Sequence, residues 1–303
     1  MANRVMVLLS CVSLFWAGAL QSAAEEPKES NDSPARLISF DDLQRRLDDQ
    51  GIRLLDVRAK DDYDEAHIPG ALWIDAKAVE KVAARPGGLV NRPAWEDWGA
   101  GLGLTPGVEV FIYDDNRQRD AARFWWLLNY LGVNNVGLVD GGFPLWKKEG
   151  RPVTADAPVI APTGFSVDFR RERLATKDDV LANLASKSAR IVDARSGAEF
   201  TGGDKRAERG GRIPGACHLE WAEFVDKDGR FLPLEALRAK LREAGLTQDG
   251  EPVITHCQSG GRASVDAFVM ERLGHPTRNY YLGWSDWGNN GDLPIETGAS
   301  EPK

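Results

Sequence analysis

The sequence of 303 residues has only three cysteines and four histidines, and neither kind forms the close pairs that bind metals. It contains no C-x-x-C motif and no two histidines at helical spacing, which argues against a structural zinc site and a disulfide-stapled fold. Basic residues do not cluster: 38 Lys and Arg stand against 46 Asp and Glu, for a net charge of −8. This balance disfavours a nucleic-acid-binding surface. We therefore expect no metal, no organic cofactor and no nucleic-acid partner.

Long hydrophobic runs are also absent after residue 24. At the start, Arg4 precedes about 16 apolar residues, and small residues up to Ala24 then lead into an acidic segment. This order is typical of a secretory signal peptide over residues 1–24. A membrane anchor is the alternative, but the run falls short of the ~20 residues that span a bilayer. We expect a periplasmic or secreted protein with no membrane attachment after cleavage, and a disordered leader at 25–35.

Cleavage after Ala24 would remove one arginine and no acidic residue, so 37 basic and 46 acidic residues would give the mature chain a net charge of −9. Two cysteines, Cys217 and Cys257, would remain. The length is about twice that of an ordinary domain, and 42% hydrophobic residues suffice for a sizeable core. Two globular domains are therefore expected.

The remaining chain repeats itself. Several motifs recur in the same order at an offset of about 137 to 145 residues: 54–58 (LLDVR) with 191–195 (IVDAR), 67–71 (HIPGA) with 212–216 (RIPGA), 103–105 with 245–247, and the Gly-Phe/Trp stretches at 142–146 and 283–287. A shared order at a nearly constant offset indicates a duplication.

Each copy alternates short apolar runs with amphipathic stretches. Residues 110–113 and 253–255 predict buried parallel strands, and 121–131 and 263–273 predict the helices that follow them. This alternation predicts an α/β fold with two tandem domains, each a parallel β-sheet flanked by helices. The expected boundaries are a first domain at 36–150, a proline-rich interdomain linker at 151–172 and a second domain at 173–300.

Between the strand and the helix of the second copy lies the loop Cys257-Gln258-Ser259-Gly260-Gly261-Arg262. Ligands of open parallel sheets bind beyond the carboxyl ends of the strands. A cysteine there faces main-chain N–H groups and the positive end of a helix dipole, and both stabilise a thiolate. Arg262 adds a positive charge. We therefore expect Cys257 to be a nucleophile, the alternative being a small buried residue.

At this point the chain, over residues 36 to about 295, resembles the tandem-domain rhodanese sulfurtransferases, the family of thiosulfate and 3-mercaptopyruvate sulfurtransferases. The resemblance rests on the motifs 193–195 (DAR), 213–216 (IPGA), 257–262 (CQSGGR) and 283–287 (GWSDW). It implies two rhodanese domains with an active cysteine in the second only. In the first copy, aligning the helices backward from Gly132 and Gly274 at a constant offset of 142 places Asp115 opposite Cys257, so that copy is expected to be catalytically inactive.

The resemblance also implies the chemistry. The Cys257 thiolate takes the outer sulfur of a small anionic donor such as thiosulfate, and the resulting persulfide passes it to cyanide or a thiol acceptor. Residues 258–261 (Gln258, Ser259, Gly260, Gly261) and Arg262 are expected to hold the donor and the persulfide. Arg195 is a candidate ligand for the donor oxygens, although an ion pair with Asp193 would explain it equally well, because the inactive copy carries the same Asp-x-Arg pattern.

Several alternatives remain at this stage. Mercaptopyruvate is a second candidate donor, although Gln258 and Arg262 depart from the loop typical of enzymes that use it. A phosphatase would need a loop with five residues between its cysteine and arginine, and here four intervene. A persulfide carrier with slow turnover is possible if the tryptophans at 95, 98, 125, 126, 284 and 287 form a partner surface rather than core. Cys217 is expected to be buried, and pairing with Cys257 is its alternative.

Overall fold

The structure is a computed structural model that describes residues 35–298 together with Met1. The expected signal peptide and most of the expected leader lie outside the described residues. Ala35, which we assigned to a disordered leader, is instead fully buried in the main core, and its carbonyl accepts a hydrogen bond from Arg272. The core thus includes at least one residue before the predicted domain boundary.

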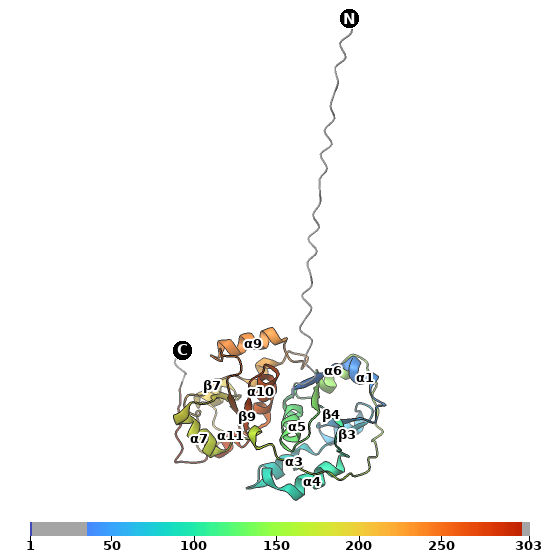
Figure 1. The fold of residues 1–303 in the computed structure, drawn as a ribbon, viewed down its shortest axis with the longest axis horizontal. Coiled ribbons are helices and arrows are strands. Elements are labelled where there is room, and N and C mark those ends of the chain that lie inside the picture. Colours follow the sequence, from blue (N-terminus) through green and yellow to red (C-terminus); the bar gives the residue numbers. More distant parts are fainter. Residues whose placement is uncertain (2–34, 299–303) are drawn as a thin grey trace. The chain divides into compact units, whose positions relative to one another are not determined.

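The first half of the chain forms a five-stranded sheet in the order β1-β5-β4-β2-β3, with every strand pair parallel. Helices follow most of its strands along the chain and flank the sheet (Figure 1). The elements are β1 (Arg36–Ile38), α1 (Phe40–Arg45), β2 (Ile52–Asp56), α2 (Lys60–Glu65), β3 (Ala71–Trp73), α3 (Ala76–Ala83), the 3-10 helix η1 (Gly88–Val90), α4 (Arg92–Gly101), β4 (Glu109–Tyr113), α5 (Arg119–Tyr130), β5 (Val136–Val139) and α6 (Gly142–Lys148).

The second half repeats this plan with a four-stranded parallel sheet in the order β7-β6-β8-β9. A single parallel bridge between Leu174 and Asn279 stands where the first sheet has β1. The elements are η2 (Arg171–Arg173), α7 (Lys177–Ser186), β6 (Arg190–Asp193), α8 (Gly197–Thr201), β7 (Cys217–His218), η3 (Trp221–Phe224), α9 (Leu234–Glu243), β8 (Val253–His256), α10 (Gly261–Arg272), β9 (Thr277–Tyr280) and α11 (Gly283–Trp287).

The predicted α/β fold with two parallel sheets is confirmed. The strands predicted at 110–113 and 253–255 are β4 and β8, each extended by one residue, and the predicted helices begin two residues early as α5 and α10. Residues 151–170, in the expected linker, form no helix or strand, apart from an isolated bridge between Thr154 and His67. Strand order makes β4 and β8 inner strands of their sheets. The loops that follow them therefore lie between neighbouring strands, at the carboxyl ends of the strands.

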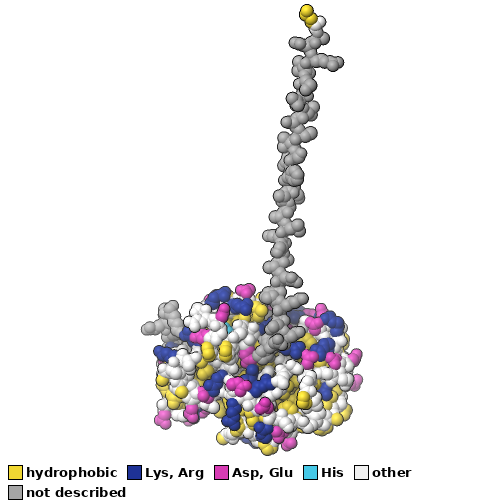
Figure 2. Space-filling view, viewed as in Figure 1, with side chains coloured by type: hydrophobic (Ala, Val, Ile, Leu, Met, Phe, Trp, Pro, Cys, Tyr) yellow, Lys and Arg dark blue, Asp and Glu magenta, His cyan; other side chains and the backbone are white. Residues whose placement is uncertain are grey.

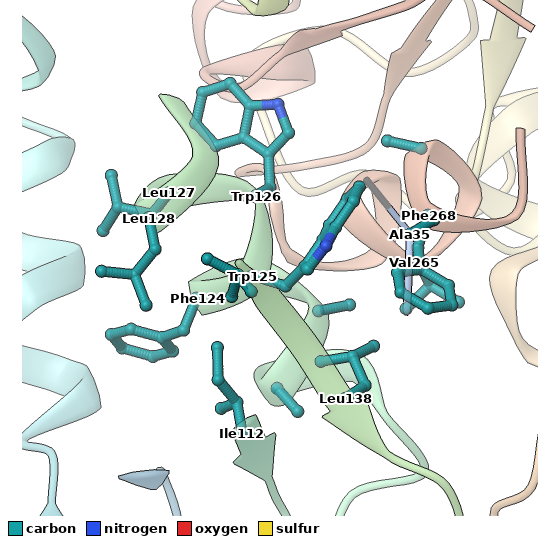
Figure 3. Close-up of a cluster of buried hydrophobic side chains, with 14 of the residues drawn as sticks. Ala35, Ile112, Phe124, Trp125, Trp126, Leu127, Leu128, Leu138, Val265 and Phe268 are labelled. Carbon is teal, nitrogen blue, oxygen red and sulfur yellow. The ribbon is translucent and has the colours of Figure 1, made fainter. Parts of the chain in front are cut away.

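Helices α5 and α10 pack against each other and join the two sheets into one hydrophobic core. Trp125 of α5 points toward Phe268 and Val265 of α10 (Figure 3), and its ring meets that of Phe268 edge to face at 5.0 Å. Trp126 stacks on Tyr281 at the same centroid distance. Five of the six tryptophans that we considered for a partner surface are at most 1% exposed, which confirms them as core: Trp95, Trp125, Trp126, Trp284 and Trp287.

The surface of the described residues is mixed in charge. Acidic and basic side chains are interspersed on the face that Figure 2 shows. Within residues 35–298, no helix has both the length and the apolar character needed to cross a bilayer.

Candidate active site

Cys257 stands directly after β8, at the carboxyl end of a central parallel strand. The chain then turns through Gln258, Ser259 and Gly260 and enters α10 at Gly261. Cys257 is 2% exposed and packs among Ala194, Ala263 and Trp221. A small polar loop that leads into a twelve-residue helix places this thiol beside the positive end of the helix dipole.

The start of α11 fixes the orientation of the loop. The carbonyl of Cys257 accepts a hydrogen bond from the Trp284 amide at 2.7 Å, and the carbonyl of Gln258 accepts one from the Ser285 amide at 3.0 Å. In a trans peptide the C=O and the following N–H point in opposite directions, so the amides of Gln258 and Ser259 are directed away from α11. Among the described residues, no acceptor bonds to the amides of residues 258–262.

The first domain corrects one of our predictions. Sheet register pairs Asp56 with Tyr113 and, in the second domain, Asp193 with His256, so the residue that matches Cys257 is Asp114. The Asp114 carbonyl likewise accepts from the first turn of α6, at 2.8 Å from the Phe143 amide. The predicted match, Asp115, is therefore wrong by one position.

The error arises because the two loops differ in length. Residues 115–118 separate Asp114 from α5, whereas residues 258–260 separate Cys257 from α10. The extra residue is accommodated by two left-handed backbone conformations, at Arg117 (φ 53°) and Gln118 (φ 70°). A constant offset carried backward from the helices cannot detect an insertion in the loop itself.

The Asp114 side chain shows what this loop binds. Its carboxylate accepts four main-chain hydrogen bonds of 2.9–3.1 Å, two on each oxygen, from the amides of residues 116, 118, 120 and 121. Burial, and then the charge of Asp120, raises the pKa of Asp114 to about 6 against the lowering effect of these amides. The loop of the first domain is thus an anion-binding nest filled by its own carboxylate.

The second domain has the corresponding loop with a thiol in place of that carboxylate. A cysteine side chain is shorter by one heavy atom than an aspartate and brings no oxygen into the loop. Thiolates and persulfides are anions that main-chain N–H groups stabilise. The arrangement suits a sulfur anion at the position where the first domain holds a carboxylate.

Arg262, predicted to bind the donor, is held by an acidic residue. Its guanidinium donates two hydrogen bonds to the Glu199 carboxylate, at 2.5 and 2.9 Å, and Glu199 is 1% exposed. Glu199 also accepts from the amide and hydroxyl of Ser196 in a capping box of α8. Burial acts to raise the pKa of Glu199, but Arg262 and Ser196 outweigh it and bring the pKa to about 2. A donor must therefore share or displace this contact of Arg262.

Arg195, the other candidate ligand, is buried in a similar pair. Its Nε and Nη2 donate to Asp193 at 2.6–3.1 Å, and Nη2 also donates to the Gly211 carbonyl at 2.7 Å. Arg195 is 1% exposed and lies 4.4 Å above the Trp284 ring. Arg58 and Asp56 form the same pair in the first domain, which has no cysteine at the corresponding place. This geometry favours the structural alternative for Arg195.

The remaining loop residues differ in exposure and in what they contact. Gln258 is partly exposed, and its side-chain amide donates to the Arg206 carbonyl at 3.0 Å. The Ser259 side chain is exposed. Gly260 is buried with a φ of +87°, and an added Cβ would lie 2.5 Å from the Tyr281 ring. Only glycine fits this position.

Sequence reasoning missed one buried polar group, Asp266, in the helix that follows the loop. Asp266, on α10, is fully buried and neither carboxyl oxygen has a hydrogen-bond partner among the described residues. Burial, and then the charges of Cys257 and Asp193, raises the pKa of Asp266 well above its usual range, which favours a protonated carboxyl. His256 is also fully buried, with Nε2 at 3.6 Å from Asp193 Oδ2. Burial lowers the pKa of His256 to about 4, so the imidazole is neutral at pH 7.

The second cysteine of the described chain lies in β7. Cys217 is buried, its Sγ contacts the Ile191 carbonyl at 3.4 Å, and neither Cys217 nor Cys257 forms a disulfide. Within residues 35–298, no group of three or more His, Cys, Asp or Glu is arranged to hold a metal ion.

The protein is a duplicated α/β protein made of two parallel-sheet domains. In the second domain a thiol follows the central strand, and in the first a carboxylate takes that place. Comparison with known proteins gives the family. The rhodanese-like domain model matches residues 39–149 and again 176–290, and the chain belongs to that family.

Relatives of known activity match nearly their whole length. The chain is 34% identical to a thiosulfate sulfurtransferase of Azotobacter vinelandii, over 84% of this chain and 94% of that one. It is also 34% identical to the sulfur carrier protein TtuD of Thermus thermophilus, over 88% and 98%. The structure of SseA from Escherichia coli, a 3-mercaptopyruvate sulfotransferase, matches with a TM-score of 0.73 at 27% identity, over 82% of this chain and 98% of that one.

The Arg262–Glu199 pair predicts a pH-dependent loss of stability. The pKa of Glu199 is lowered from 4.5 to about 2, so its ionised form stabilises the fold above about pH 4.5, and this contribution is lost as the pH falls toward about 2. Glu199→Gln should lower the free energy of unfolding by about 2 kcal/mol at neutral pH, and the difference from wild type should shrink as the pH falls through that window. Urea unfolding at neutral pH and at about pH 3 measures both values.

Glu208→Gln is the matched control, because Glu208 lies exposed in the neighbouring loop. It should leave stability unchanged at both pH values. An equal deficit of the Glu199 variant at neutral and acidic pH would contradict the assignment of this ion pair.

Proposed function

We propose that this protein is a sulfurtransferase that moves a sulfane sulfur from thiosulfate to cyanide or a thiol through a persulfide on Cys257. One observation carries the proposal: the loop of the first domain binds the Asp114 carboxylate with four amides, and the loop of the second has Cys257 at the same place in the sheet register. A site that stabilises an anion there suits both a thiolate and a persulfide.

The reaction proceeds in two displacements. The Cys257 thiolate attacks the outer sulfur of thiosulfate, a new S–S bond forms, and the sulfur–sulfur bond of the donor breaks with its electron pair leaving on sulfite. Cyanide then attacks the outer sulfur of the persulfide, the S–S bond to Cys257 breaks, and thiocyanate leaves while the thiolate is restored. A thiol acceptor would take the same sulfur as its own persulfide. Neither step needs an added oxidant or reductant.

Local charges must attract the donor, since the chain as a whole is acidic. Arg262 lies in the first turn of α10 and retains 15% side-chain exposure. Arg206, 57% exposed, stands 3.7 Å from Glu199 but lies closer to Asp204, at 3.3 Å. The partly exposed guanidinium of Arg262 and the positive end of the α10 dipole are therefore the local groups that would attract an anionic donor.

Thiosulfate is favoured over mercaptopyruvate by the loop sequence, which places Gln258 second and the cation Arg262 sixth. The Azotobacter vinelandii relative, a thiosulfate sulfurtransferase, supports this choice. The Escherichia coli relative SseA supports mercaptopyruvate as the second candidate. The Thermus thermophilus relative, a sulfur carrier protein, supports a third reading, in which the persulfide is held for a partner and turnover is slow.

Replacement of the thiol tests the proposed intermediate. Thiosulfate should add one sulfur atom to the wild-type protein, and cyanide should remove it, because a persulfide is cleaved by that nucleophile. Cys257→Ser should add none and should lose sulfur transfer by at least about a thousandfold, since a hydroxyl cannot replace a thiolate here. Intact-mass spectrometry before thiosulfate, after thiosulfate and after cyanide measures these states.

Cys217→Ser is the matched control and should load and release sulfur like the wild type. Sulfur retained by Cys257→Ser would overturn the proposal. Single loading without repeated turnover over several acceptors would replace the enzyme with a carrier.

Donor preference is tested by initial rates. With cyanide as acceptor, the wild-type protein should give a higher kcat/KM with thiosulfate than with 3-mercaptopyruvate, because the latter carries one carboxylate and no second anionic group for the loop cations. Loading by mercaptopyruvate alone would reverse the choice of donor and leave Cys257 as the sulfur carrier.

We also propose that the protein is exported to the periplasm or secreted, on the strength of the basic start, the apolar run and the small residues before Glu25. Expression of the full chain in a bacterial host should yield a periplasmic or secreted form whose first residue is Glu25. N-terminal sequencing of that fraction checks this, and an uncleaved chain confined to the cytoplasm would contradict it.

A further inference from the structure

The first domain sends one charged side chain into the active-site loop of the second. Arg123 lies on α5, between the buried apolar residues that pack against α10, and is itself only 8% exposed. A charge is costly in such a place unless it is paired. Its partners are therefore informative about why it is there.

The Arg123 guanidinium spans from the first domain to the second. Its Nη1 donates to the Ser259 carbonyl at 2.8 Å and to the Tyr281 hydroxyl at 3.2 Å. On the side of its own domain, Nε stands 3.1 Å from a carboxylate oxygen of Glu80, which is 38% exposed. The contact with Tyr281 is buried, whereas the contacts with Ser259 and Glu80 are partly exposed.

The loop is shaped around this side chain. A Cβ at Gly261 would lie 2.5 Å from Arg123 Nη2, so any larger residue would push the guanidinium away. A Cβ at Gly260 would meet the Tyr281 ring at the same distance. The two consecutive glycines are thereby explained by the close approach of Arg123 and its hydrogen-bond partner Tyr281 to the main chain.

Ser259 is the third successive residue of this segment whose carbonyl accepts a hydrogen bond from outside the loop. The carbonyls of Cys257 and Gln258 are held by the amides of Trp284 and Ser285, and Arg123 holds the next carbonyl, that of Ser259. The amide of Gly260 shares the Ser259 peptide plane and points the opposite way. Three successive carbonyls are thus fixed on protein donors, and the orientation of three successive amides follows.

The charge of Arg123 is held against the loop by the contact with Ser259. Burial acts to lower the pKa of Arg123, but Tyr281, Glu80 and Cys257 raise it above its ordinary value. Glu199, which is ionised, offsets the charge of Arg262, whereas the partner carboxylate of Arg123 is partly exposed and therefore screened.

We propose that Arg123 is a positioning residue through which the first domain completes the active site of the second: it orients the loop amides and brings a buried positive charge beside them. The second domain alone would lack both effects. This inference deepens the proposed sulfur transfer and rests on it for the kinetic readout only, because the ionisation of Cys257 can be measured without any donor.

Titration of the thiolate in the full-length protein separates positioning from simple domain packing. The ultraviolet absorbance of the Cys257 thiolate is followed against pH, with the matching Cys257→Ser protein subtracted. Arg123→Met should move the midpoint upward by about one pH unit. Persulfide formation from thiosulfate at neutral pH should slow about tenfold, by intact mass over time. Arg123→Lys keeps the charge and should restore most of the shift.

Arg119→Met is the matched control, since Arg119 lies one turn earlier on α5 and, among the described residues, pairs only with Asp120. It should leave the titration and the rate unchanged. Arg123→Gln removes the charge and is two atoms shorter, so it should also raise the midpoint, and it decides the question by the same titration if Arg123→Met does not fold. Thermal unfolding of each variant establishes that it is folded.

A wild-type titration midpoint in folded Arg123→Met or Arg123→Gln would overturn the proposal, as would an equal shift in Arg119→Met. If thiosulfate does not load the wild-type protein, the proposed donor fails. A shifted midpoint in the Arg123 variant would then still support the role of this residue.

Discussion

The convergence of main-chain amides on one anionic group is the constraint on which both halves of this molecule depend. In the first domain the group is the Asp114 carboxylate, held by four amides. In the second domain Cys257 stands at the corresponding place, with the carbonyls of Cys257 and Gln258 bonded to the start of α11, and we propose that the loop amides converge on its sulfur. An amide ring of this kind works only if the carbonyls of the same peptide planes are bonded elsewhere, which explains why the loop is enclosed by α11, Tyr281 and Arg123.

Duplication gives the two domains different tasks. The first fills its own nest with the Asp114 carboxylate, while its helix α5 packs against α10. The second retains the thiol but offsets the charge of Arg262 with Glu199. The charges of Arg262 and Glu199 therefore largely cancel. For this reason a charged group from outside the second domain, Arg123 above all, contributes to the proposed reaction.

Much of this could be predicted from the sequence, and the exceptions have physical causes. The repeated motifs and short apolar runs predicted two parallel sheets and the strand–loop–helix around Cys257, because these features depend on local pattern. The match of Asp115 to Cys257 was wrong because an inserted residue is absorbed by left-handed backbone at Arg117 and Gln118, which are ordinary residues in sequence. The Glu199–Arg262 and Arg123–Ser259 contacts join distant segments, which no spacing indicates. A charged residue within the apolar stretch of α5 was the one available signal for Arg123.

The most direct test of the amide ring is a crystal structure of the protein after reaction with thiosulfate. The account predicts one additional sulfur on Cys257 Sγ, lying within hydrogen-bonding distance of the amides of residues 258–262, while the Asp114 carboxylate keeps its four amide contacts. A second sulfur that points out of the loop, or loading at Cys217 with Cys257 unmodified, would contradict it.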